Sequence, residues 1–289
     1  MKGIVLAGGA GKRLYPSTLV VSKQLLPVYD KPMIFFPLSV LMLAGIRDIL
    51  IITTPEESDN IKKLLKDGSQ YGVKFSYLVQ PKPEGIAQAL ILAEEFINND
   101  PIALILGDNI FYGGGFTGVL KKAVKSMEGN RASILTCKVR EAERFGVVEF
   151  DSNKQIISIE EKPKKPKSNY AVTGLYFYPA GVSELAKTLT PSSSSELEIT
   201  DLNNIYLQNK QLDAFVCPRG VVWLDTGLHS TLLQAGQYIH TVEETQGTKV
   251  ACLEEIALRN GYITEDELRE FISQMGDGEY YNYVKELIK

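Results

Sequence analysis

The chain has 289 residues, enough to bury a substantial hydrophobic core without disulfides or structural metals. Hydrophobic residues make up 44% and charged residues 23% of it, which is typical of globular proteins and excludes disordered, collagen-like and coiled-coil classes. With 31 Lys and Arg against 35 Asp and Glu, the formal net charge is -4, so the chain lacks the general basic character that holds nucleic acid, and any phosphate must be bound locally.

The first 140 residues alternate short apolar runs with longer segments of helical periodicity. This alternation, with a run as continuously apolar as Ile102–Leu106, predicts a parallel sheet buried by helices on both faces. We therefore expect an α/β fold with a doubly wound, mostly parallel nucleotide-binding sheet of the Rossmann-like type. The expected strands are Gly3–Ala7, Asp48–Thr53, Phe75–Val79 and Ile102–Leu106, and the expected helices are Phe35–Ala44, Ser58–Leu65, Ala87–Phe96 and Gly118–Met127.

After about Arg140 the pattern changes to short strands and polar loops, and the tail from His229 onward is mostly helical. No linker or internal repeat separates these parts. We predict one domain over 1–289, with a nucleotide-binding half at 1–140, an embellished part at 141–228 and a helical C-terminal region at 229–289. The expected elements are the strands Gly146–Phe150, Ile156–Ile159 and Ala171–Tyr178 and the helices Ser230–Glu244, Leu253–Arg259, Glu265–Gln274 and Tyr280–Ile288.

The three cysteines, Cys137, Cys217 and Cys252, are odd in number and widely spaced, without a C-x-x-C motif. This argues against a disulfide framework and against a zinc ribbon, and favours a reducing cytoplasmic location. No run approaches the roughly 18 apolar residues of a membrane helix. We expect a cytoplasmic protein without a membrane partner.

A glycine-rich loop, Gly8–Gly11, directly follows the first predicted strand and leads into Lys12 and Arg13. Glycines let backbone N–H groups approach an anion closely, because no Cβ intervenes. The loop is not the dinucleotide fingerprint, which needs Gly or Ala where Leu14 stands, and not a Walker loop, which needs Ser or Thr where Arg13 stands. A plain strand-to-helix turn is the alternative, but the Lys12–Arg13 pair favours a phosphate-binding loop.

Three charged residues occupy positions that suit a polyphosphate and a metal ion. Lys23 lies among apolar neighbours soon after the loop, where it could add a donor to the same phosphate site, although a lone lysine is more often a surface group. Asp108 and Asp225 each follow an apolar run, and ligands of parallel sheets bind beyond the carboxyl ends of strands. Two such carboxylates, with phosphate oxygens and water, suit Mg²⁺, whereas either aspartate alone could be a turn former.

Eight motifs in order make the chain resemble the sugar-nucleotide pyrophosphorylases over nearly its whole length, most of all the branch that transfers a thymidylyl group. The motifs are G-G-A-G-K-R-L-Y-P at 8–16, S-K-Q-L-L-P at 22–27, D-K-P-M-I at 30–34, L-G-D-N-I-F-Y-G at 106–113, R-F-G-V-V-E-F at 144–150, E-E-K-P at 160–163, N-Y-A-V-T-G-L-Y-F-Y at 169–178 and W-L-D-T-G at 223–227.

The resemblance implies an enzyme that converts dTTP and glucose 1-phosphate to dTDP-glucose and pyrophosphate with Mg²⁺ as cofactor. It implies further that the product feeds deoxysugar synthesis for cell-surface polysaccharide. A homotetramer and feedback inhibition by dTDP-rhamnose at a second nucleotide site are also implied, as is a sugar-phosphate role for the part of the chain at 141–228.

Carried onto this sequence, the resemblance also implies roles for individual residues. Gly8, Gly11, Lys12, Arg13, Lys23 and Gln24 hold the nucleotide phosphates, while Gln80 and Gly85 read the base. Asp108, Asn109, Gly146, Glu161, Lys162 and Val172 line the sugar-phosphate site, and Asp108 with Asp225 holds the magnesium. The second nucleotide site involves Arg219, Gly220, Glu255, Ile256 and Arg259.

The chemistry of this reaction suits the residues present. A sugar phosphate is already a nucleophile, so the protein has to align it with the α-phosphorus and to neutralise the charge that develops. The catalytic residues are then Arg13 and Lys23 on the departing phosphates, Lys162 on the attacking phosphate, and Asp108 and Asp225 on the metal. No catalytic base is required, which fits a chain with only two histidines.

Two positions depart from the family pattern. Lys12 stands where threonine is usual; its side chain could add a charge on the triphosphate or leave the pocket, and its backbone N–H could still serve. Ser194 stands where many relatives carry an arginine that holds the sugar phosphate, which predicts weaker binding of glucose 1-phosphate. Two alternatives stay open: a uridylyltransferase that makes UDP-glucose, since uracil and thymine present the same edge to Gln80, and a non-catalytic regulator that binds nucleotide sugars.

Overall fold

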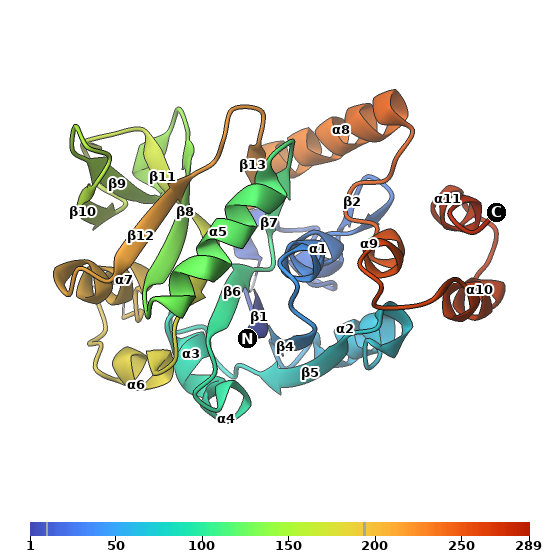
Figure 1. Cartoon of the computed structure of the whole chain (residues 1–289), viewed down its shortest axis with the longest axis horizontal. Helices are drawn as coiled ribbons and strands as arrows, with labels where there is room; N and C mark the ends of the chain where they lie inside the picture. The colour runs from blue at the N-terminus through green and yellow to red at the C-terminus, as the bar shows by residue number, and fades with distance from the viewer. Residues whose placement is uncertain (10, 193–194) are drawn as a thin grey trace.

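The computed structural model of the chain describes residues 1–9, 11–192 and 195–289, and a mixed nine-stranded sheet forms its centre (Figure 1). The strand order is β10-β9-β11-β6-β1-β4-β5, and β8 pairs with the other edge of β11 and carries β12. The strands are β1 (Lys2–Ala7), β4 (Asp48–Thr53), β5 (Lys74–Val79), β6 (Ile102–Leu106), β8 (Ala132–Lys138), β9 (Gly146–Phe150), β10 (Ile156–Glu161), β11 (Tyr170–Tyr178) and β12 (Leu212–Val216).

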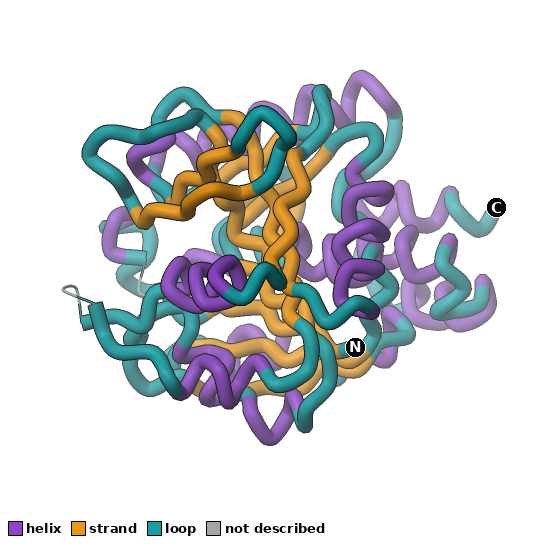
Figure 2. The backbone as a smooth tube through the Cα atoms, turned by 60° about the vertical axis from the view of Figure 1, so that its left-hand side comes forward, coloured by secondary structure: helices purple, strands orange, loops and turns teal. Residues whose placement is uncertain are grey.

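Helices cover both faces of this sheet, as the continuous apolar strands predict. They are α1 (Phe35–Leu43), α2 (Ser58–Leu65), α3 (Gln88–Leu92), α4 (Glu94–Ile97), α5 (Phe116–Glu128), α6 (Val182–Lys187), α7 (Ile199–Gln208), α8 (His229–Gln246), α9 (Leu253–Arg259), α10 (Glu265–Ser273) and α11 (Glu279–Glu286). In Figures 1 and 2, α9, α10 and α11 lie together at the end of the molecule that bears the C-terminus.

Neighbouring residues of the central strands belong to two different cores, because successive side chains point to opposite faces of a sheet. Val5 and Ile105 pack in the core on the side of α1, α5 and α9. Ile4 and Leu104 pack in the core on the side of α3, α6 and α7. This double burial explains the uninterrupted apolar runs, and the predicted fold class is confirmed by the parallel pairing of β6, β1, β4 and β5.

Strand β11 joins the parallel part of the sheet to the rest and runs antiparallel to its neighbours. Along one edge its first part pairs with β9 through Ala171 and its last part pairs with β6 through Leu175–Tyr178. Between these pairings the two partner strands diverge, and Val172 and Gly174 face the larger cavity described below. The opening in the sheet therefore lies at the middle of β11.

Two small sheets stand apart from the central one. Strands β2 (Pro27–Val28) and β3 (Lys31–Pro32) form a hairpin, and β7 (Asn109–Tyr112) pairs antiparallel with β13 (Val222–Asp225). The β7–β13 pair connects the segment after β6 with a segment near residue 225 that is remote in sequence. This pairing positions the candidate site.

Some predicted elements differ from the structure. The single helix expected over Ala87–Phe96 is two short helices, because the backbone at Ala93, with ψ of 6°, interrupts the regular geometry. Strands β8 and β12 were not predicted, since buried polar residues such as Ser133 and Thr136 interrupt the apolar pattern of β8. Within the described ranges, no helix combines the length and the apolar character needed to cross a membrane.

Candidate active site

The glycine loop follows β1 at the carboxyl end of the parallel strands, and a cavity of about 280 Å³ opens beside it. This position suits an anion, because glycines of the loop line the cavity without a Cβ between their backbone and a ligand. The cavity brings together predicted phosphate-binding residues from three segments. Its lining comprises Gly9, Gly11, Lys12, Arg13, Leu14, Lys23, Gln24, Asp108 and Gly227.

Lys23 is buried rather than solvated, with 6% of its surface exposed. It lies on a short 3-10 helix, Lys23–Leu25, whose N-cap Ser22 accepts from the N–H of Gln24 and donates to the Gln24 side-chain oxygen at 2.7 Å. The ammonium group of Lys23 forms an ion pair with Asp108. Lys23 thus places a buried cation, paired with Asp108, in the wall of the smaller cavity.

The two predicted metal ligands meet because β7 and β13 pair in register, with Asp225 opposite Asn109 and Asp108 immediately before it. Thr226 holds the two segments together, since its N–H and its hydroxyl both donate to the Asp108 carbonyl, at 3.2 and 2.8 Å. Burial raises the pKa of Asp225, and the negative charge of Asp108 raises it further, while Lys23, Arg13 and Arg144 act in the opposite direction.

This donor set fits a magnesium ion. Two carboxylates that repel each other in a half-closed site are stabilised by a divalent cation between them, and Mg²⁺ prefers such oxygen ligands together with water and phosphate oxygens. Within the described ranges no cluster of three or more His, Cys, Asp or Glu side chains forms.

The side chain of Asn109 is buried and forms its hydrogen bonds with other groups of the protein. Its side-chain oxygen accepts from Trp223 Nε1 at 2.5 Å and from the N–H of Gly174 at 3.0 Å. Its amide nitrogen donates to Asp108 Oδ1 at 2.9 Å. With 2% of its surface exposed, Asn109 lies at the edge of the sugar-phosphate site predicted for it and orients Asp108.

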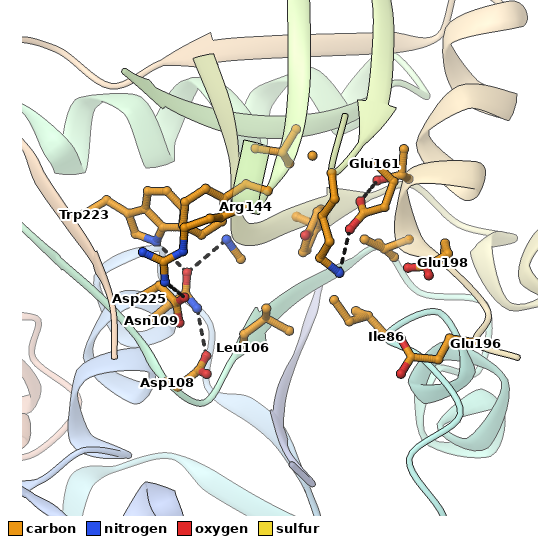
Figure 3. A pocket seen from close by; sticks show the side chains of 18 of the residues that line it. Ile86, Leu106, Asp108, Asn109, Arg144, Glu161, Glu196, Glu198, Trp223 and Asp225 are labelled. Atoms are coloured by element: carbon orange, nitrogen blue, oxygen red, sulfur yellow. Dashed lines mark hydrogen bonds and ion pairs between the residues drawn. The ribbon is translucent and has the colours of Figure 1, made fainter. Parts of the chain in front are cut away.

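A larger cavity of about 480 Å³ lies beside the aspartate pair and shares Arg13 and Asp108 with the smaller one. Its walls include every predicted sugar-phosphate residue. Figure 3 shows Asp108, Asn109, Arg144, Trp223 and Asp225 gathered at one end and Glu161, Glu196 and Glu198 at the other.

The acidic end of the larger cavity is built around Glu161 and Lys162. Thr200 donates to Glu161 Oε2 at 2.5 Å, and the Lys162 ammonium lies 3.1 Å from Glu161 Oε1. Burial alone would lower the pKa of Lys162, but the charges of Glu161, Glu198 and Glu196 outweigh it, so the pKa is raised. Lys162 therefore remains a cation whose charge is largely balanced by carboxylates.

Arg144 is a functional candidate that the sequence reasoning did not single out. Its guanidinium lies 4.0 Å from Asp225 Oδ2 and 3.0 Å from Glu141 Oε2, and it stacks over the ring of Phe145 at 5.5 Å. It lines the larger cavity at the end that holds the aspartates. The sequence feature that could have identified Arg144 is its position in the R-F-G-V-V-E-F motif, directly before a predicted strand.

The predicted base-reading residues Gln80 and Gly85 line neither of these two cavities, although Gln80 lies beside the glycine loop. Gln80 follows β5, is 2% exposed, and reaches Gly8, where a Cβ would lie 2.5 Å from Gln80 Oε1. Gly85 packs on Leu197 with φ of 105°, and a Cβ there would lie 2.4 Å from the Leu197 carbonyl oxygen. Position 85 therefore requires glycine, because the atoms in the way belong to the Leu197 backbone, whereas at position 8 the close atom is the end of the flexible Gln80 side chain.

The residues predicted for a second nucleotide site fall in two places. Arg219 and Gly220 lie in the turn between β12 and β13, whereas Glu255, Ile256 and Arg259 lie on α9. Glu255 pairs with Arg259 at 2.6 Å and accepts from Tyr283 at 2.7 Å. Within the described part of the chain, no hydrogen bond or ion pair joins the two groups. Ser194 lies outside the described residues.

Comparison with known proteins agrees with this geometry. Residues 2–242 match the family model described as nucleotidyl transferase. A Neisseria meningitidis protein named glucose-1-phosphate thymidylyltransferase is 55% identical over 289 residues, covering 100% of both chains. A Xanthomonas campestris protein of the same name is 51% identical, covering 100% of this chain and 97% of its own.

Solved structures show the same fold. A Bacillus anthracis crystal structure named for glucose-1-phosphate thymidylyltransferase, in complex with a sucrose, is 39% identical with a TM-score of 0.75, covering 98% of this chain and 99% of its own. A UDP-glucose pyrophosphorylase complexed with UDP-glucose is 25% identical with a TM-score of 0.72, covering 83% of this chain and 98% of its own.

Proposed function

The chain belongs to the nucleotidyl transferase family, and on that premise we propose that this enzyme transfers the thymidylyl group of dTTP to glucose 1-phosphate, releasing pyrophosphate. The observation that carries the proposal is that two cavities meet at Arg13 and Asp108. The smaller one lies along the glycine loop and suits a triphosphate, and the larger one has the size and the polar walls that a sugar phosphate needs.

The residues then act by alignment and charge. Arg13 and Lys23 line the smaller cavity, and with the triphosphate bound there their cations would favour departure of the negatively charged pyrophosphate. Lys162 binds the phosphate of the sugar, and Glu161 is available to accept from sugar hydroxyls. Holding the two substrates at the junction of the cavities replaces a bimolecular encounter by an aligned one, and no proton has to be removed from the nucleophile.

Asp108 and Asp225 would hold Mg²⁺, which when bound supplies positive charge to the phosphate oxygens. Asn109 keeps the Asp108 carboxylate oriented, and the ion pair of Lys23 with Asp108 has to open when Lys23 turns to phosphate. Arg144, at the aspartate end of the larger cavity, adds a second cation beside Asp225.

Gln80 and the backbone around Gly85 would read the base, because an amide presents one donor and one acceptor to N3–H and O4 of thymine. Uracil presents the same two groups, so uridylyl transfer to make UDP-glucose is the alternative product. The dTDP-glucose that we propose would enter deoxysugar synthesis for polysaccharide. Feedback by dTDP-rhamnose at Arg219, Gly220, Glu255, Ile256 and Arg259, and assembly as a cytoplasmic homotetramer, belong to the same proposal.

Pyrophosphate release tests the proposal directly. The enzyme is mixed with glucose 1-phosphate, Mg²⁺ and one of dTTP, UTP, dCTP, ATP or GTP. Fast release with dTTP that stops when the metal is chelated is the expected result. Release with UTP alone would make the chain a uridylyltransferase, and no release with any nucleotide would contradict a transfer to glucose 1-phosphate.

A further inference from the structure

Behind the predicted base reader Gln80 lies a chain of three hydrogen bonds that ends on a carboxylate. Gln80 Nε2 donates to Gln88 Oε1 at 2.5 Å. The N–H of Glu84 donates to the same Gln88 oxygen at 3.1 Å, and Gln88 Nε2 donates to Glu84 Oε2 at 2.6 Å. We call Gln80, Gln88 and Glu84 the amide relay. Glu84 thus contacts both ends of the Gln88 amide.

The chemistry of these groups allows only one orientation of the Gln88 amide. A carboxylate only accepts and a backbone N–H only donates, so Gln88 must turn its nitrogen to the Glu84 carboxylate and its oxygen to the Glu84 N–H. The oxygen of Gln88 then faces Gln80, which must present its own nitrogen. Glutamine amides usually lack so strict a constraint, because their two ends have the same shape.

The relay therefore decides what Gln80 presents to a ligand. One N–H of Gln80 is taken by Gln88, while Oε1 points to Gly8 and receives no hydrogen bond from the described residues. The remaining edge offers Oε1 as acceptor and the second N–H as donor. This order matches N3–H and O4 of thymine or uracil, and cytosine carries the opposite order at the same two positions. If the oxygen and nitrogen of the Gln80 amide exchanged places, the amide would match cytosine instead.

The scaffold keeps the relay in place. Leu197 donates through its N–H to the Glu84 carbonyl at 2.8 Å, and the N–H of Ala87 donates to the Leu197 carbonyl at 3.2 Å. Gly85 packs closely on the Leu197 backbone, where a Cβ would lie 2.4 Å from the carbonyl oxygen. Gln88 is the first residue of α3, so the backbone that carries the relay is fixed on both sides.

We propose that Glu84 and Gln88 are positioning residues that hold the Gln80 amide in the orientation that accepts thymine or uracil and rejects cytosine. The inference rests on the proposed function, since it takes Gln80 as the residue that meets the base. Neither Glu84 nor Gln88 need touch the nucleotide. Their effect is on the choice of base, and the transfer chemistry at Asp108 and Asp225 is left unaffected.

Two variants separate hydrogen-bond direction from packing. Gln88→Met keeps a side chain of similar length but removes the acceptor for Gln80. The double variant Glu84→Gln with Gln88→Glu exchanges the two groups, keeps the net charge, and still turns an acceptor oxygen toward Gln80 Nε2. Dissociation constants for dTTP and dCTP are measured by calorimetry, and kcat/KM for both nucleotides by pyrophosphate release.

We expect wild type to prefer dTTP, Gln88→Met to lose about tenfold of that preference, and the exchange variant to keep it within about twofold. The KM for glucose 1-phosphate should stay constant. An unchanged preference in Gln88→Met overturns the proposal, as does an equal loss in both variants or a wild type without preference. A wild type that binds dTTP selectively but releases no pyrophosphate contradicts the proposed function instead, and the binding ratios still decide on the relay.

Discussion

Asp225 lies opposite Asn109 in the β7–β13 pair, one residue from Asp108, so two carboxylates that are remote in sequence share one end of a cavity. The proximity of the two carboxylates is electrostatically unfavourable, since burial and the charge of Asp108 both raise the pKa of Asp225. A divalent cation between the two carboxylates would offset this repulsion, which fits phosphate chemistry at the site. The first two predictions follow from this arrangement.

Replacing either aspartate should nearly abolish turnover. Asp108→Asn and Asp225→Asn each remove one charged ligand from a metal that has few protein ligands to lose. Steady-state pyrophosphate release at varied Mg²⁺ concentration measures the effect, with the exposed Asp59→Asn on α2 as control. Near-normal, magnesium-dependent turnover in either variant would refute the metal assignment, provided that circular dichroism shows an intact fold.

The same Asp225→Asn change should stabilise the protein without substrates. The pKa of Asp225 is higher folded than unfolded, so its contribution to stability is complete below the ordinary aspartate pKa and is lost as pH rises through the folded value. At neutral pH the variant should melt a few degrees above wild type, and the difference should shrink toward pH 4. Thermal melts without Mg²⁺ check this. A variant that melts below wild type at neutral pH would contradict it.

Arg144 should matter more for the transfer step than for dTTP binding. It lines the larger cavity close to Asp225, on the sugar-phosphate side of the site. We expect Arg144→Ala to lower kcat/KM for glucose 1-phosphate by about tenfold or more, because a charge-assisted contact to phosphate is lost, with little change in the KM for dTTP. Arg140→Ala, an exposed arginine four residues earlier, is the control. Equal effects of the two variants would show that Arg144 has no specific role at the site.

Adding an arginine at position 194 should strengthen sugar-phosphate binding. Ser194 lies outside the described residues, and the prediction rests on the family resemblance, which implies an arginine at this position of the sequence. Ser194→Arg should lower the KM for glucose 1-phosphate by about tenfold and leave dTTP unchanged, since an arginine fork can bind phosphate through two hydrogen bonds. Lys162→Ala should raise the same KM severely. If the KM for glucose 1-phosphate does not respond to Ser194→Arg, this position does not face the substrate.

A second nucleotide site predicts feedback inhibition that is not purely competitive. Arg259 is exposed and pairs with the buried Glu255 one helical turn earlier, so without a regulatory role this ion pair serves only to stabilise α9. On the regulatory reading, Arg259→Ala weakens inhibition by dTDP-rhamnose and leaves uninhibited turnover unchanged. Inhibition kinetics with both substrates varied distinguish the two readings. Purely competitive inhibition in wild type would rule out the second site.

Local sequence was sufficient for the architecture around the phosphate loop. Strands β4 and β6 and helices α2 and α9 match the predicted ranges, because side chains buried on both faces impose an apolar run and helices impose their own period. The glycines after β1 were equally visible, since backbone access to an anion needs residues without Cβ. These features depend on neighbours within one element.

The site itself depends on pairings between elements that are remote in sequence. The register of β7 against β13 brings Asp225 to Asp108, and the divided edge of β11 opens the larger cavity. Arg144 was missed because an arginine before a strand has no local feature that distinguishes a cavity wall from a surface. The direction of the Gln80 amide was invisible for the same reason, since it depends on Glu84 and Gln88 contacting it in the folded chain. Composition and periodicity report how a segment is buried, whereas the partner and the register of each strand are decided only when the whole sheet assembles.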